Sequence, residues 1–221
     1  YRLTGSPTTT WTSMSVAKSF TSAALGIAQG EGLFGSVEEQ IVDHLPELRG
    51  SAYDGARIKD VLQMSSGARW NEDYSDPDSD INRFIAVFAH GGSFNALAAT
   101  LVRQREPGTY NLYNSTDTQV LGMLLKKVTG RSIRDYVEEK IWHPLGMQDD
   151  AHWLLDSEGM EMAFGGLPLV TSVITEGAPA DLAAILVGGS AGMVVYALLL
   201  LRADLPEARL LVEGVRRKLA R

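Results

Sequence analysis

Apolar residues recur every three to four positions along most of the first 150 residues, which is the spacing of amphipathic helices. Glycine or proline follows each periodic run and is expected to end it. Strand-like alternation is scarce in this part of the chain, so the pattern predicts a mainly α-helical fold. A polar stretch, RWNEDYSDPDSD, predicts a loop at 69–80. Helices are expected within residues 16–33, 36–48, 57–67, 80–92, 93–108, 115–130 and 131–147.

The C-terminal part of the chain differs from the rest in its charge pattern. From Leu182 to Leu201 there is no charged residue, and six basic residues follow. Twenty such residues would span about 30 Å as a helix, enough for a bilayer, and the basic excess would then place the C-terminus in the cytoplasm. A membrane anchor, a buried core helix and sequence that is not native to the gene are the three alternatives. The chain is therefore divided into residues 1–167 and an atypical tail, 168–221.

Composition and charge narrow the classes of function. Hydrophobic residues make up 45% and charged residues 21% of the chain, as in an ordinary globular protein. The net charge of -7 argues against a nucleic-acid partner, because phosphate binding needs a basic surface. The lack of cysteine excludes disulfides, thiolate catalysis and cysteine-bound zinc. No signal-peptide pattern follows Tyr1, and the localisation and oligomeric state stay open.

One short stretch, SMSVAKSF, carries candidate chemistry. Ser15 and Lys18 are three residues apart, so a helix would place both on one face. A hydroxyl beside an amine is one way to build an activated nucleophile. The alternative is a helix N-terminus with a capping serine, and this stretch alone does not decide between the two.

Several further stretches, in order, give the chain a family resemblance. SVAK at 15–18, IKDVLQMSSG at 58–67, EPGTYNLYNS at 106–115 and VTGRSIRDYVEEKIWHPLGM at 128–147 resemble blocks of serine β-lactamase-related proteins. RWNEDYSDP at 69–77 and EMAFGGL at 161–167 are similar to the branch that contains 6-aminohexanoate-oligomer (nylon-oligomer) hydrolases and related esterases. The resemblance covers about residues 10–167. It implies the helical domain of an α+β fold whose active site lies against an antiparallel sheet.

The resemblance implies a role for each matching residue. Ser15 would be the acyl-accepting nucleophile, and Lys18 would help to take its proton, which requires a lowered amine pKa. Tyr113 would be the second member of the base and would pass a proton to the leaving group. Ser115 stands where many relatives have asparagine. A hydroxyl there loses the two-ended hydrogen bonding of an amide, which favours amides or esters of simple acids over penicillins as substrates.

Two aromatic residues of the 69–80 loop are further candidates for substrate binding. Tyr74 would line the pocket over the leaving group, or it is an ordinary loop tyrosine. Trp70 would form a pocket wall, or it anchors the loop. The resemblance implies a small-molecule amide or ester substrate and no metal or organic cofactor. A β-lactamase or penicillin-binding peptidase is the first alternative function; an inactive helical remnant, or a membrane-tethered module if 182–201 is a genuine span, is the second.

The expected family sheet has no counterpart in the sequence pattern. No K-T-G or H-x-G segment follows Leu167, and strands before the nucleophile helix are not visible. Read two bases later, the codons for TSVIT at 171–175 can spell Leu-Arg-Asp-Tyr, as relatives have after the G-G-L motif. We therefore favour a frameshift near 167–168 over a membrane anchor. Residues 1–221 alone are expected to be poorly active and prone to associate.

Overall fold

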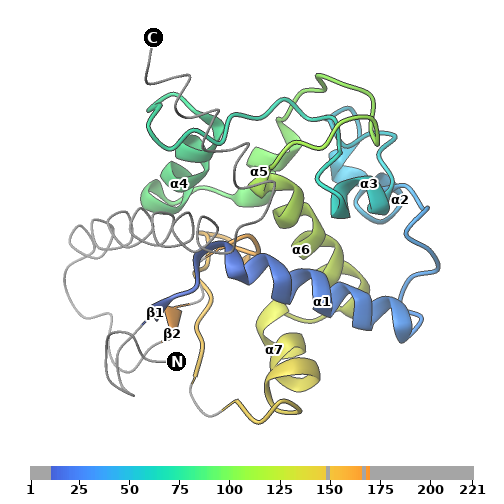
Figure 1. Ribbon diagram of the computed structural model, residues 1–221, viewed down its shortest axis with the longest axis vertical. Coiled ribbons are helices and arrows are strands. Elements are labelled where there is room, and N and C mark those ends of the chain that lie inside the picture. Colours follow the sequence, from blue (N-terminus) through green and yellow to red (C-terminus); the bar gives the residue numbers. More distant parts are fainter. Residues whose placement is uncertain (1–10, 148–149, 166–167, 170–221) are drawn as a thin grey trace, which may run out of the picture. The chain divides into compact units, whose positions relative to one another are not determined.

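The computed structural model describes residues 11–147, 150–165 and 168–169, and within these ranges its regular secondary structure is almost entirely helical, joined by long loops (Figure 1). The expected mainly α-helical character is therefore confirmed for this part of the chain. The elements, in chain order, are β1 (Trp11–Thr12), η1 (Met14–Val16), α1 (Ala17–Gly30), α2 (Ile41–His44), η2 (Pro46–Leu48), α3 (Ile58–Leu62), α4 (Asp80–His90), α5 (Phe94–Ala99), α6 (Ser115–Thr129), α7 (Ile133–Val137), η3 (Glu138–Trp142) and β2 (Pro168–Leu169).

Helix α6 forms the centre of the fold. Its residues 115–125 are all buried, and helices α1, α3 and α5 pack against it (Figure 1). Gly122 allows a close approach on one side, because a Cβ at this position would lie 2.4 Å from the Ala163 side chain. The approach brings the chain around residue 163 between α6 and α1. There the Thr21 hydroxyl, on α1, donates a 2.7 Å hydrogen bond to the Ala163 carbonyl.

An aromatic cluster joins the loop at 69–80 to the core. The Phe84 ring lies 5.2 Å from Phe94, 4.9 Å from Phe164 and 5.9 Å from Trp70, measured between ring centroids. Phe84 and Phe94 are fully buried, which ties helices α4 and α5 to the segment that carries Phe164. Aromatic pairs at these distances add about 0.5–1.5 kcal/mol each beyond burial.

The helix ends follow the sequence in most places. Serine side chains cap α4, α5 and α7, and Gly91 and Gly130 end α4 and α6 in the left-handed conformation. Several expected helices are shorter than the pattern predicts, among them α3, which spans only Ile58–Leu62 of the expected 57–67. Residues 36–40 do not continue α2, which spans only Ile41–His44. Helix α5 ends at Ala99, because residues 101–103 instead pair with neighbouring loops through Ala52, Ala68 and Arg69.

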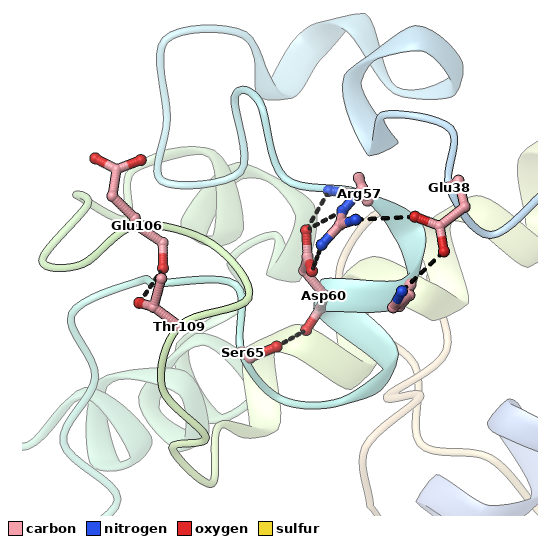
Figure 2. A network of polar contacts seen from close by, with 7 residues as sticks. Glu38, Arg57, Asp60, Ser65, Glu106 and Thr109 are labelled. Carbon is pink, nitrogen blue, oxygen red and sulfur yellow. Dashed lines mark hydrogen bonds and ion pairs between the residues drawn. The ribbon is translucent and has the colours of Figure 1, made fainter.

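A polar network supports α3 from the surface (Figure 2). The Arg57 guanidinium donates to both carboxylate oxygens of the buried Asp60 and to Glu38 at 2.9 Å. Ser65 donates from its hydroxyl to the Asp60 carbonyl at 3.0 Å. Gly108 packs directly on this network at φ +78°, and a Cβ there would lie 2.8 Å from Asp60 Oδ1. The Pro-Gly turn at 107–108 therefore fits only because this residue has no side chain.

Little of the expected sheet falls within the described residues. Strands β1 and β2 are two residues each and pair antiparallel, with Trp11 opposite Leu169. The apolar segment 182–201 and the frameshift hypothesis for 168–221 lie outside the described part, apart from β2. Among the residues that are described, no helix has the length and apolar character needed to cross a bilayer.

Candidate active site

Ser15 lies on a tight turn at the entrance to α1. The turn is the 3-10 segment η1, and it begins with Met14 at φ 46°. A positive φ is uncommon outside glycine and costs on the order of 1–3 kcal/mol. The turn leaves Ser15 exposed, whereas Ala17 just after it is buried. The hydroxyl thus lies at the N-terminal end of α1, where the helix dipole favours negative charge.

Lys18 extends from the first turn of α1 to the same place. Its amine donates hydrogen bonds to Ser15 Oγ at 2.9 Å and to the Phe164 carbonyl at 2.8 Å. The Tyr113 and Phe164 rings lie 5.2 Å and 5.5 Å from the amine. Loss of water around the amine lowers the pKa of Lys18 to about 8, and the negative charge of Glu72 partly opposes this shift. A measurable fraction of this amine is therefore neutral near pH 8.

Tyr113 completes the group from the opposite side. Its hydroxyl donates a 2.9 Å hydrogen bond to Ser15 Oγ. Burial, with a smaller contribution from the Glu72 charge, raises the pKa of Tyr113, while the Ser15 hydrogen bond lowers it in part. The phenol therefore keeps its proton at neutral pH and can donate it. Of the three residues predicted as catalytic, Lys18 and Tyr113 thus both lie within hydrogen-bonding distance of the third, at Ser15 Oγ.

The chain before Tyr113 is fixed by backbone pairing with the loop after α3. Gly108 and Leu112 donate from their amides to the carbonyls of Ser65 and Met64, at 2.7 Å and 2.8 Å. Gly67, at φ +80°, lies so close to this segment that a Cβ would be 2.1 Å from the Arg105 carbonyl oxygen. The S-S-G and P-G-T stretches, which are about 40 residues apart, therefore form one structural unit that holds Tyr113.

A buried carboxyl group lies beneath the start of α6. Oδ1 of Asp117 accepts hydrogen bonds from the Tyr53 hydroxyl at 3.0 Å, the Ser66 hydroxyl at 2.7 Å and the Asn114 amide at 3.1 Å. Its Oδ2 is buried and has no hydrogen-bond partner among the described residues. Burial raises the pKa of Asp117 to about 7, although the hydrogen bonds from Ser66 and Tyr53 oppose the shift.

Glu72 links the three predicted substrate-binding residues. The sequence had not indicated a role for Glu72. Its Oε1 accepts from the Ser115 hydroxyl at 2.6 Å and from the Tyr74 hydroxyl at 3.2 Å. Its Oε2 accepts from the Ser115 amide at 3.1 Å and from the Trp70 indole. The signal available in the sequence was one carboxylate placed midway between the two aromatic candidates in W-N-E-D-Y.

The three predicted substrate-binding residues are not equally open to solvent. Tyr74 is 45% exposed and can reach a ligand. Trp70 is 7% exposed and packs edge-on against Phe84, which favours the loop-anchor alternative. Ser115 is fully buried, and its hydroxyl is engaged by Glu72. Of the three, only Tyr74 is exposed enough to contact a ligand.

Comparison with known proteins identifies the scaffold that carries this arrangement. The family model described as Beta-lactamase matches residues 5–220. The chain belongs to the beta-lactamase family. This is a family of hydrolases that act on amides and esters. Among the described residues no group of three or more His, Cys, Asp or Glu side chains could hold a metal ion.

Individual proteins resemble the chain over about 70–75% of its length. A 6-aminohexanoate-dimer hydrolase of Paenarthrobacter ureafaciens is 29% identical over 160 residues, which is 70% of this chain and 41% of that protein. A putative 6-aminohexanoate-dimer hydrolase from Bacillus anthracis superposes with a TM-score of 0.63 at 22% identity, over 71% of this chain and 43% of that one. A class C beta-lactamase gives a TM-score of 0.55 at 19% identity, over 75% and 48% of the two chains. The chain thus spans less than half the length of these relatives.

Proposed function

We propose that this chain carries the nucleophile of a serine hydrolase that cleaves amide or ester bonds through an acyl-enzyme on Ser15. The observation that supports it best is the position of Ser15 Oγ, which receives hydrogen bonds of 2.9 Å from both Lys18 and Tyr113. A serine between an amine and a phenol has an acceptor for its proton on one side and a donor on the other. Neither group alone would provide both.

The pKa shifts favour Lys18 as the proton acceptor. With its pKa lowered to about 8, the neutral amine of Lys18 can take the Ser15 proton as Oγ attacks the substrate carbonyl carbon. The new C–O bond forms a tetrahedral intermediate, and its collapse breaks the bond to the leaving group. Tyr113, whose raised pKa keeps it a phenol, donates a proton to that group and regains one from Lys18. Water then cleaves the Ser15 ester by the reverse sequence.

The buried Ser115 supports simple amides or esters as substrates. In place of a side-chain amide open to a ligand there is a hydroxyl bonded to Glu72, which leaves the exposed Tyr74 as the polar group on that side. The relative named 6-aminohexanoate-dimer hydrolase agrees with this substrate class. A β-lactamase or penicillin-binding peptidase is the second candidate, supported by the fold shared with a class C beta-lactamase. Turnover of a p-nitrophenyl ester against nitrocefin separates the two.

A complete oxyanion pocket is expected to need a donor from outside the described residues. Losing one such donor costs about 10²–10³ in rate. The test of the proposal therefore measures a single covalent event instead of turnover. The 221-residue chain is incubated with a fluorophosphonate probe, and the modified peptide is identified by mass spectrometry.

Labelling is expected at Ser15 and is expected to disappear in Ser15→Ala. Ser19→Ala is the matched control, because Ser19 is exposed in the first turn of α1, four residues after Ser15. It should label as the unmodified protein does. Retention of full labelling in Ser15→Ala would refute the assignment of the nucleophile, and nitrocefin turnover exceeding ester turnover would favour the second candidate.

A further inference from the structure

Both oxygens of the Glu72 carboxylate are occupied by hydrogen bonds from other groups of the protein. It accepts four hydrogen bonds from three residues, namely the amide and hydroxyl of Ser115, the hydroxyl of Tyr74 and the indole of Trp70. A carboxylate has about four lone-pair sites, so little capacity is left for a ligand. Its function is therefore to be sought in the groups that it holds.

Those groups connect the 69–80 loop to the start of α6. Ser115 is the first residue of α6, and Glu72 binds both its backbone amide and its side chain. Tyr113 lies two residues earlier, just outside the helix, and is 45% exposed. The position of its hydroxyl therefore depends on the backbone on both sides of it, which is the segment paired with Met64 and Ser65 and the start of α6. Glu72 fixes the start of α6 from the side on which the loop approaches.

The same carboxylate is an electrostatic partner of the site. Its negative charge raises the pKa of Lys18 against the larger, opposite effect of burial, and it also raises the pKa of Tyr74 and of Tyr113. The charge of Glu72 thus acts on Lys18, Tyr74 and Tyr113 together. Within the described part of the chain, Glu72 is the charged side chain that acts on the pKa of Lys18.

We propose that Glu72 is a positioning residue of this site, which holds Tyr113 against Ser15 through the start of α6 and acts by its charge on the Lys18 amine. The proposal rests on the proposed serine hydrolase function for its effect on rate. Its two parts, position and charge, can be separated by two substitutions. Glu72→Gln removes the charge and keeps the length of the side chain, whereas Glu72→Asp keeps the charge and shortens the reach.

The first measurement is the rate of Ser15 acylation by a fluorophosphonate as a function of pH. In Glu72→Gln the midpoint of the profile should fall by at least about 0.5 pH unit, because the amine loses a neighbouring negative charge. In Glu72→Asp the midpoint should stay near that of the unmodified protein, while the plateau rate falls roughly ten-fold or more through misplacement of Tyr113. Asp78→Asn is the matched control, since Asp78 is an exposed carboxylate on the same loop. It should change neither quantity.

The second measurement does not depend on catalysis. The side-chain ¹³C signal of Lys18, assigned with Lys18→Arg, is titrated by NMR in the unmodified protein and in both Glu72 variants. A lower Lys18 midpoint in Glu72→Gln supports the proposal even where no acylation is detected, and an absence of acylation would count against the proposed function alone. An unchanged Lys18 midpoint in a folded Glu72→Gln protein overturns the electrostatic part. An unchanged plateau rate in Glu72→Asp overturns the positioning part.

Discussion

The hydroxyl of Tyr113 donates a 2.9 Å hydrogen bond to Ser15 Oγ across 98 residues of sequence. The variant Tyr113→Phe tests this hydrogen bond, because it keeps the ring and removes only the hydroxyl. We expect acylation of Ser15 to slow by about 10²–10⁴, the usual contribution of a positioned proton donor. The fold should persist, because Tyr113 is already 45% exposed. Stopped-flow measurement of ester acylation, with circular dichroism as the fold control, tests this, and a loss below about threefold would make Tyr113 a packing residue.

Lys18 predicts the direction of the pH dependence. Its pKa is lowered to about 8, and the neutral amine is the form that accepts a proton. The acylation rate should therefore rise as pH increases through about 8 and level off above it. Lys18→Arg keeps a positive charge that does not titrate in this range, so it should abolish the rise. Lys127→Arg, at an exposed position of α6, is the control and should leave the profile intact.

Gly67 is expected to be intolerant of any side chain. Its φ is +80°, and a Cβ would lie 2.1 Å from the Arg105 carbonyl oxygen, which is backbone and cannot turn away. Gly67→Ala should therefore lower the free energy of unfolding by more than about 2 kcal/mol. Gly26→Ala is the matched control in α1, where a Cβ meets nothing within 4 Å. Helix propensity predicts that it stabilises the protein by about 0.5–1 kcal/mol, and urea denaturation distinguishes the two outcomes.

Asp117 should make stability depend on pH in an unusual direction. Its pKa is raised from 3.8 to about 7 in the folded state, so between these values the folded protein binds a proton that the unfolded chain releases. The free energy of unfolding should then decrease as pH rises from about 4 to about 7, with a steepest slope of about 1.4 kcal/mol per pH unit from this group. The slope should be measured above pH 5. Carboxylates with lowered pKa values, such as Asp60, act below that range.

Asp117→Asn removes the titrating group and keeps its shape. The variant should show a flatter dependence of the urea midpoint on pH between 5 and 7 than the unmodified protein. Asp54→Asn, near the surface of the loop that carries Tyr53, is a control that should retain the slope. An identical slope in the unmodified protein and in Asp117→Asn would mean that Asp117 is ionised throughout this range.

How far the sequence predicts this site depends on the range of each interaction. Ser15 and Lys18 are one helical turn apart, so their proximity follows from local periodicity, and the spacing of Tyr113 from its Pro-Gly turn was informative through the family resemblance. Glu72 escaped prediction because its partner Ser115 is 43 residues away and acts through a tertiary contact. The same cause shortened α5, whose apolar periodicity continues past Ala99 while the backbone turns away to pair with other loops.

The proposed roles of Trp70 and Ser115 show what a motif cannot convey. Their residue types and positions suggested contact with substrate, but burial decides accessibility, and burial depends on the aromatic cluster and on Glu72. The tail at 170–221 lies outside the described residues, so the absence of most of the family sheet and the frameshift hypothesis both stay predictions. The nucleotide sequence of the gene and its flanks would test it directly.

The positive φ of Met14 has a consequence for the variation that this position can accept. In a saturation library selected for folding alone, glycine and asparagine at position 14 should be enriched, since they adopt this conformation at low cost. Isoleucine, valine and threonine should be depleted, because branching at Cβ makes the left-handed region least accessible. A second selection, for reaction at Ser15, would show whether the flexibility of glycine is tolerated beside the nucleophile. The difference between the two enrichment profiles would separate what the turn requires from what the chemistry requires.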